Sequence, residues 1–204
     1  MNTQEALKEL RNEKKRKFVQ TLDLIVNLRQ FDVRKEALNT FVQIPNPPAK
    51  KICAFLTKKS KLVDTITELD FEKYKETKDI KKLAKKYDMF IAVAPMMGKV
   101  ATKFGRVLGP IGKMPSPQAG VIMKETEDEI KNMIDKVNSV VRVRNKEMAV
   151  KLPIGKEDMS DKHLIENIEG VVSGLESKLP RGKENIKEVL IKFTMTKPIK
   201  VMEK

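Results

Sequence analysis

The spacing of apolar residues changes twice along this chain, and these changes limit the folds it can adopt. Leucine or valine occupies every second position from Leu22 to Leu28, and the same period of two returns from Val140 to Val143. That period is typical of half-buried strands. Between these segments, strand-like and helix-like patterns alternate, as they do in parallel sheets. We therefore expect an antiparallel, helix-covered architecture from the two chain ends and a parallel one in the middle.

The first change of period coincides with a proline cluster. Pro45, Pro47 and Pro48 are three prolines within four residues, and proline removes backbone donors and interrupts regular structure. A chain of 204 residues is long enough for one large domain or two small ones. We interpret the proline cluster as a hinge, and a middle domain inserted into an end-built domain would explain the pattern.

The same patterns predict the individual elements. Helices are predicted over Thr3–Lys15, near Lys61–Leu69, near Ile80–Tyr87, over Met96–Leu108, after Thr126 with Glu129 completing a capping box, and from Ser160. Strands are predicted over Thr21–Leu28, Asn39–Ile44, Lys51–Leu56, Met89–Ala94, at Val121, over Val140–Val143 and Met148–Leu152 as a hairpin, and over Ile186–Thr196. A loop is predicted over Gly109–Gly120.

Charge is the first indication of function. The chain has 42 Lys and Arg against 28 Asp and Glu, a net charge of +14 that favours a polyanionic partner. RNA, DNA and an anionic membrane surface all fit this charge, and a merely soluble basic surface is the plain alternative. Aromatic residues make up only 5% of the chain, which argues against a single-strand binder built on stacking platforms and favours recognition of a structured backbone.

Several other functions are not expected. No apolar run approaches the length of a membrane span, and the N-terminal residues lack the apolar core of a secretion signal, so the protein is expected inside the cell. The single cysteine, Cys53, lies in an apolar run and is predicted to be a buried core residue, so neither a redox pair nor a zinc site is expected. The single histidine, His163, is predicted to lie on a helix surface with no nucleophile in a recognised motif.

One segment has an unusual composition. No acidic residue occurs between Asp88 and Glu125, whereas this stretch holds five of the nine glycines and four of the ten prolines. Its cations are Lys99, Lys103, Arg106, Lys113 and Lys124. Glycine lets a backbone approach a ligand, proline stiffens a loop, and cations neutralise phosphate.

Three interpretations of this segment remain open. It is a phosphate-cradling loop of a nucleotide-binding α/β enzyme, a rigid loop with solvated lysines, or a rigid basic loop that meets a nucleic-acid backbone. The glycine spacing matches neither nucleotide-binding motif, and Met114 stands where a P-loop has its hydroxyl residue, so nothing there would hold magnesium. We predict a protein that is not an enzyme and has no cofactor or metal, and we keep the nucleotide-binding enzyme as the alternative.

At this segment the chain resembles a known family. The residues Gly105-Arg106-Val107-Leu108-Gly109-Pro110, Gly112-Lys113-Met114-Pro115, Pro117 and Ala119-Gly120 are similar to the signature of the ribosomal protein L-one family. Lys17-Phe18 resembles the start of that family's RNA-binding strand, and Phe193 to Pro198 resembles its terminal Thr-Met-Gly motif. Thr196 stands where that motif has glycine.

The resemblance implies a fold and a function. It implies a discontinuous RNA-binding domain, residues 1–45 and 139–204, with an antiparallel α+β architecture, and an inserted Rossmann-like three-layer α/β domain, residues 46–138. It implies a protein that is monomeric off the ribosome and that binds large-subunit ribosomal RNA as a mobile stalk. It also implies help with release of deacylated tRNA from the exit site and repression of translation of its own messenger RNA. The loop sequence and the short C-terminus resemble archaeal more than bacterial members.

The resemblance also implies site residues. The ribosomal and messenger RNA surface is expected on the outward face of the first and last strands, with the hairpin nearby: Lys17, Phe18, Thr21, Asp23, Thr194, Met195, Thr196, Arg144 and Lys146. The tRNA-facing basic loop is expected to use Lys99, Lys103, Arg106 and Lys113. The hinges are expected at Pro45, Pro47 and Pro48 and at Asn138 and Ser139. From the residues alone, strand propensity accounts for the threonines and core packing accounts for Phe18 and Met195.

Overall fold

The chain divides into two compact units. The computed structural model describes residues 2–14, 16–33, 36, 38–74, 76–145 and 147–203, with the backbone alone at 202 and 203. One unit, here called the end-built unit, comprises Met1–Pro48 and Ser139–Lys204; the other, the inserted unit, comprises Ala49–Asn138. Both mix helices with sheets, so the expected mixture of helix and sheet is confirmed. No helix in the described ranges is long and apolar enough to cross a membrane.

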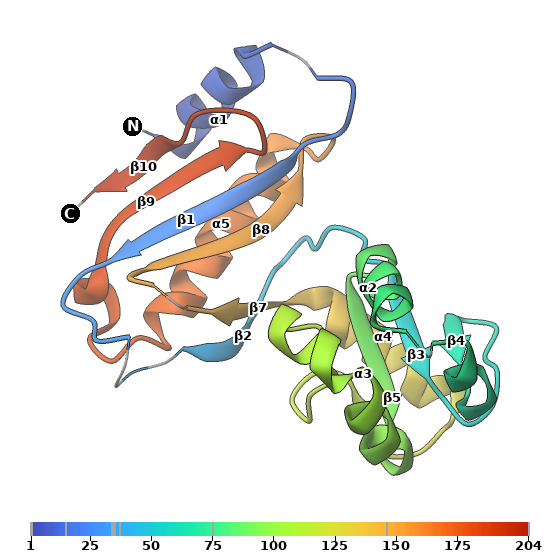
Figure 1. The fold of residues 1–204 in the computed structure, drawn as a ribbon. Helices are drawn as coiled ribbons and strands as arrows, with labels where there is room; N and C mark the ends of the chain where they lie inside the picture. Colours follow the sequence, from blue (N-terminus) through green and yellow to red (C-terminus); the bar gives the residue numbers. More distant parts are fainter. Residues whose placement is uncertain are drawn as a thin grey trace. The chain divides into compact units, whose positions relative to one another are not determined.

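The end-built unit is organised on a four-stranded antiparallel sheet (Figure 1). Its strands, in spatial order, are β10 (Ile199–Glu203), β9 (Ile186–Phe193), β1 (Thr21–Leu28) and β8 (Ala149–Lys156). The alternation in β1 is confirmed, because Leu22, Leu24, Val26 and Leu28 are buried while the intervening residues are only half-buried. The buried face packs against α1 (Thr3–Asn12) and α5 (Asp161–Glu176).

The two helices on this sheet are joined by one arginine. The Arg11 guanidinium lies 2.7 Å from Asp161 Oδ1 and donates to the carbonyls of Glu157 and Met159 at 2.9 and 2.7 Å. Because these acceptors lie just before and at the start of α5, Arg11 holds the end of α1 against it. Ser160, the N-cap of α5, accepts from the His163 N–H at 3.4 Å, so the predicted start of this helix is confirmed.

The predicted hairpin between Val140 and Leu152 is wrong. Strand β7 (Val140–Arg144) pairs with β2 (Asn39–Gln43) in a separate two-stranded ribbon, whereas β8 pairs with β1. Asn145 separates the two strands: its N–H donates to the Leu38 carbonyl at 3.2 Å, and its side-chain oxygen accepts from the Leu38 N–H at 2.7 Å. The spacing of apolar residues identifies strands but not their partners.

The last predicted strand is also shorter than expected. Strand β9 ends at Phe193, and a turn follows in place of a strand through Thr196. The Thr196 hydroxyl accepts from the Phe193 N–H at 2.9 Å, and the Thr196 N–H donates to the Phe193 carbonyl at 3.1 Å. Among the described non-glycine residues only Gln30 has a positive φ, so Thr196 closes this turn without the left-handed backbone that would require glycine.

The inserted unit contains a parallel sheet with helices on both sides. In spatial order its strands are β4 (Asp64–Ile66), β3 (Ile52–Phe55), β5 (Met89–Val93) and β6 (Val121–Ile122). One core joins the sheet to η1 (Glu68–Lys73), α2 (Thr77–Lys86), η2 (Ala94–Met96) and α3 (Met97–Ile111), and the other joins it to α4 (Glu127–Ser139). Cys53 is buried as predicted, and burial raises the pKa of its thiol to about 12.

Two predictions for this unit are wrong. The helix expected near Lys61–Leu69 is instead β4 followed by η1, because β-branched residues such as Thr65 pair with β3. Leu69, the last residue of the expected helix, is 87% exposed. The loop expected from Gly109 is still helical: α3 runs through Pro110 to Ile111 and ends at Gly112, which has φ 81°.

The capping box expected at the start of α4 is only half present. The Thr126 hydroxyl accepts from the Glu129 N–H at 3.4 Å. The Glu129 carboxylate accepts instead from the Lys124 N–H, at 2.9 Å. Glu129 therefore ties the segment before α4 to its first turn.

We predict that the end-built unit folds without the inserted one. The Ile44 N–H donates to the Ser139 carbonyl at 2.8 Å, so the two points of insertion are adjacent and a short Gly-Asn-Gly linker can join Pro45 to Ser139. A unit with its own core survives removal of an insert when few contacts cross the boundary. The shortened chain should show helix and sheet by circular dichroism and one cooperative thermal transition; a random-coil spectrum would contradict this.

Candidate nucleic-acid interface

The start of β1 and the turn after β9 form one connected cluster. The Thr21 N–H donates to Thr194 Oγ1 at 3.1 Å, and the Thr194 hydroxyl is 3.4 Å from the Thr21 carbonyl, to which it donates. The Met195 N–H donates to Gln20 Oε1 at 3.1 Å. We call residues 18–21 and 194–196 the strand-end cluster. The structure thus brings together residues 173 positions apart that the sequence assigned to one surface.

The apolar members of the strand-end cluster point to solvent. Phe18 is 52% exposed, Val19 58% and Met195 55%. Core packing, the plain explanation for Phe18 and Met195, is therefore wrong. Exposed large apolar side chains gathered on a surface mark an interaction site more often than scattered ones do.

Gln20 is a residue that sequence reasoning missed. It is only 3% exposed, and its N–H donates to Glu157 Oε2 at 3.2 Å while the Glu157 N–H donates to its carbonyl at 2.8 Å. Its side-chain oxygen holds Met195, as described above. A single buried glutamine beside a strand has no motif, so no signal in the sequence pointed to this positioning role.

Asp23 is half-buried on the uncovered face of the sheet, two residues into β1. Burial raises the pKa of its carboxyl above the ordinary value, and Lys192, its register partner on β9, partly opposes that effect. An acid here does not attract phosphate. A carboxylate repels phosphate, so Asp23 is less suited to a phosphate-rich surface than its neighbours.

Of the other residues expected at this surface, one lies beside the strand-end cluster and one does not. Lys17 is exposed and directly precedes Phe18. Arg144 pairs with Asn39 in the separate β2–β7 ribbon, and the chain after it leads to Ala149, which pairs with Asn27 at the end of β1 away from Thr21. The structure therefore does not bring Arg144 to Thr21. Lys146 lies outside the described residues.

The four cations expected to form a basic loop have different surroundings. The Lys113 ammonium donates to the carbonyls of Ala84 and Tyr87 at 2.9 and 2.8 Å, at the C-terminal end of α2. A cation at this position satisfies carbonyls that have no helical partner and complements the helix dipole. Lys113 is therefore a structural cap. Lys99 forms an ion pair with Glu68, while Lys103 and Arg106 have no recorded partner among the described side chains.

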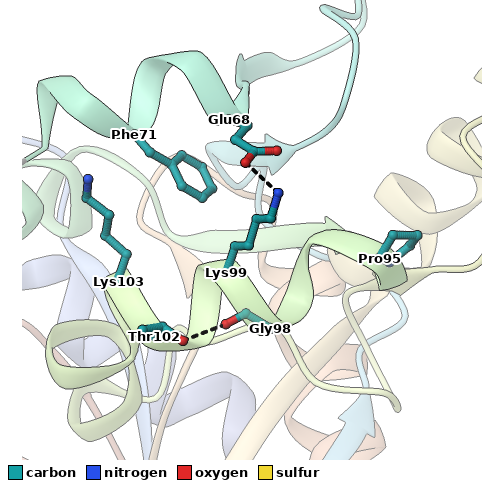
Figure 2. Close-up of a pocket in the computed structure, with 7 residues that line it drawn as sticks. All are labelled: Glu68, Phe71, Pro95, Gly98, Lys99, Thr102 and Lys103. Carbon is teal, nitrogen blue, oxygen red and sulfur yellow. Dashed lines mark hydrogen bonds and ion pairs between the residues drawn. The ribbon is translucent and has the colours of Figure 1, made fainter.

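A shallow groove of about 560 Å³ lies between η1 and α3 (Figure 2). Lys99 and Lys103 rise from α3 on either side of the Phe71 ring, and the Thr102 hydroxyl donates back to the Gly98 carbonyl at 2.9 Å. Glu68 and Pro95 complete the lining. The groove combines the Lys99–Glu68 ion pair and the Lys103 ammonium with a small apolar floor, so Lys103 is its cation without a recorded partner among the described side chains.

The structure argues against a loop that binds the phosphates of a nucleotide. Gly98, Gly105 and Gly109 lie inside α3, so they do not form a loop that wraps phosphate. His163 is exposed near the start of α5, as predicted for a surface histidine.

The predicted hinge residues are partly fixed. Asn46 is held to α5, since its N–H donates to Asn167 Oδ1 at 2.8 Å and the Asn167 side chain donates to its carbonyl at 2.7 Å. Ser139 is the last residue of α4, and β7 starts at the next residue. In the inserted unit, the Lys50 ammonium donates to the Val137 and Asn138 carbonyls, and burial lowers the pKa of Lys50 to about 8. These hydrogen bonds hold Asn46 within the end-built unit and Lys50 within the inserted unit, and the hinge stays a prediction.

Comparisons with known proteins agree on one family. The model of the Ribosomal protein L1p/L10e family matches residues 10–197. The chain is 36% identical to "Large ribosomal subunit protein uL1" of Nanoarchaeum equitans, with 96% of this chain and 97% of that protein covered. It is 38% identical to the protein of the same name from Thermococcus kodakarensis, with 97% and 95% covered.

We predict that Asp23→Asn stabilises the fold at neutral pH. The folded-state pKa of Asp23 is raised, so the folded protein binds this proton more tightly than the unfolded chain does. The loss of folding stability caused by ionised Asp23 is absent below the ordinary aspartate pKa of about 3.9. It grows as the pH rises from there through the folded-state pKa. In urea unfolding, Asp23→Asn should raise the midpoint at pH 7, and its advantage should shrink on acidification. The exposed Asp158→Asn is the control, and an equal shift from it would refute the explanation.

We also predict that Lys113→Met destabilises the protein by about 1 to 2 kcal/mol, because it leaves helix carbonyls without their charged donor. Arg106→Met, at an exposed side chain, should change stability by less than about 0.5 kcal/mol. Chemical denaturation measures both. Equal effects would mean that Lys113 is a solvated surface lysine.

Proposed function

The chain belongs to the Ribosomal protein L1p/L10e family, and from this membership we propose that it is a structural constituent of the large ribosomal subunit whose end-built unit binds large-subunit ribosomal RNA. Proteins of this family are structural parts of the ribosome and not enzymes. The observation that carries the proposal is the strand-end cluster. It gathers exposed apolar groups at one end of a rigid sheet in a chain of net charge +14.

The chemistry of this cluster suits folded RNA. Phe18 and Met195 offer apolar surface to riboses or unstacked bases, and RNA is recognised largely through such surfaces and its 2′-hydroxyl groups. Lys17, beside Phe18, is placed to meet phosphate. The hydrogen bonds of Gln20, Thr21 and Thr194 hold these groups in position before RNA arrives, which lowers the ordering cost of binding.

The two units are proposed to be separate domains with separate tasks. The inserted unit has a parallel sheet with helices on both sides, an arrangement in keeping with a Rossmann-like three-layer domain. We assign ribosomal RNA to the end-built domain and contact with departing deacylated tRNA to the inserted domain of the stalk. Lys99, Lys103 and Arg106 remain the tRNA-facing candidates; Lys113 is left out because it caps α2.

Repression of the protein's own messenger RNA is proposed to use the strand-end cluster as well. One surface cannot hold two RNAs at once, so ribosomal RNA and messenger RNA would compete. Synthesis would then stop only when free protein exceeds its ribosomal sites.

We predict that Phe18→Ala weakens binding to a large-subunit ribosomal RNA fragment by about 1 to 3 kcal/mol, the usual cost of losing one aromatic contact with a base. Lys17→Ala should lower the slope of log affinity against log salt by about one, as expected for one phosphate contact. Met123→Ala, which removes a side chain 76% exposed in the inserted unit, is the control. Filter binding across a salt series measures all three. Equal loss in Phe18→Ala and Met123→Ala would reject the strand-end cluster as the binding surface.

A further inference from the structure

The helices of the inserted unit carry opposite charges on its two sides. Five lysines and one acid lie on α2, three cations and no acid on α3, and four acids and two lysines on α4. Helices α2 and α3 pack on one side of the sheet and contact each other, whereas α4 packs on the other side. We call the outer surface of the first two helices the α2–α3 face.

The cations of α2 point away from the core. Ile80, Leu83 and Ala84 are buried, and all five lysines of the helix are exposed. Two of the five are engaged: Lys82 lies 3.3 Å from Asp79, and Lys86 lies 3.9 Å from Asp64 and over the Tyr87 ring. The other three have no recorded partner among the described side chains: Lys78, Lys81 and Lys85.

The cations of α3 form a single stripe. Lys99, Lys103 and Arg106 are spaced by four and three residues, so they share one side of the helix over roughly 10 Å. Lys99 and Lys103 also border the groove over Phe71 (Figure 2). The stripe therefore borders a shallow groove on this face in which a chain could lie.

We propose that the α2–α3 face docks a second stretch of RNA backbone, with the lysines of α2 as contacts in addition to the stripe on α3. This inference rests on the proposed function and extends its basic site from the three cations of α3 to the lysines of α2. It also implies which side of the inserted unit meets the RNA, because the acidic α4 side would face away from it.

The chemistry of the face favours phosphate over other anionic partners. The outward positions of α2 carry no large apolar side chain, whereas helices that lie on membranes insert such residues between lipids. No aromatic residue is exposed on α2 or α3, so the face can attract a backbone but has little means of reading bases. Contacts should therefore be electrostatic, independent of sequence and readily exchanged.

The test compares two matched pairs of substitutions in the full chain. Lys81→Gln with Lys85→Gln removes two charges from α2; Lys124→Gln with Lys131→Gln removes two charges before and on α4. Glutamine keeps helix propensity close to that of lysine. Binding of an RNA duplex that lacks ribosomal sequence is followed by fluorescence anisotropy across a salt series. We expect the α2 pair to reduce the salt slope by about two and the α4 pair to leave it unchanged.

A failure of the α2–α3 face can be distinguished from a failure of the proposed function. Lys81→Arg with Lys85→Arg keeps the charge and should restore the slope. Equal slopes for the α2 and α4 pairs, or no duplex binding by the wild-type chain at low salt, would overturn the α2–α3 face while leaving the strand-end cluster intact. If the α2 pair alters binding to phosphatidylserine vesicles or to an acidic protein but not to the duplex, RNA is the wrong partner. Failure of the wild type to bind ribosomal RNA would instead contradict the proposed function.

Discussion

The pairing of β1 with both β8 and β9 is the constraint on which the end-built unit depends. A central strand must satisfy backbone donors and acceptors on both edges, and an unpaired buried group costs about as much as a lost hydrogen bond. The partners of β1 begin at Ala149 and Ile186, so the chain has to return from the inserted unit before this sheet can form. The same pairing places Thr21 beside the turn after β9 and thereby creates the strand-end cluster.

Net charge alone does not identify the cations available to a ligand. Lys113 caps α2, Lys50 bonds carbonyls at the end of α4, and Arg11 joins α1 to α5. These three stabilise the fold, because each satisfies carbonyls or a carboxylate that would otherwise lack a donor. The cations left for a polyanion are those exposed without a recorded partner among the described side chains, such as Lys81 and Arg106. Separating the two groups requires the neighbours of each side chain.

Prediction from the sequence succeeded where the signal was local. The alternation in β1, the Ser160 cap of α5 and the buried Cys53 follow from residues within a few positions of one another, and all three are confirmed. Prediction failed where a distant partner decided the outcome. The hairpin after Val140 is absent because β2 and β1 compete successfully for its two strands, and β4 replaces a helix because β3 offers it an edge.

The sequence by itself determined the type and rough position of most elements, the excess of positive charge and, through motif resemblance, the family. Periodicity and composition encode these properties directly. Only the tertiary structure decided that Phe18 and Met195 are exposed, that Gln20 positions the turn, that Arg144 lies in a ribbon separate from the main sheet and that Lys113 is a cap. Each of these depends on a neighbour far away along the chain, and the spacing of residues in one segment carries no information about which distant group will lie beside it.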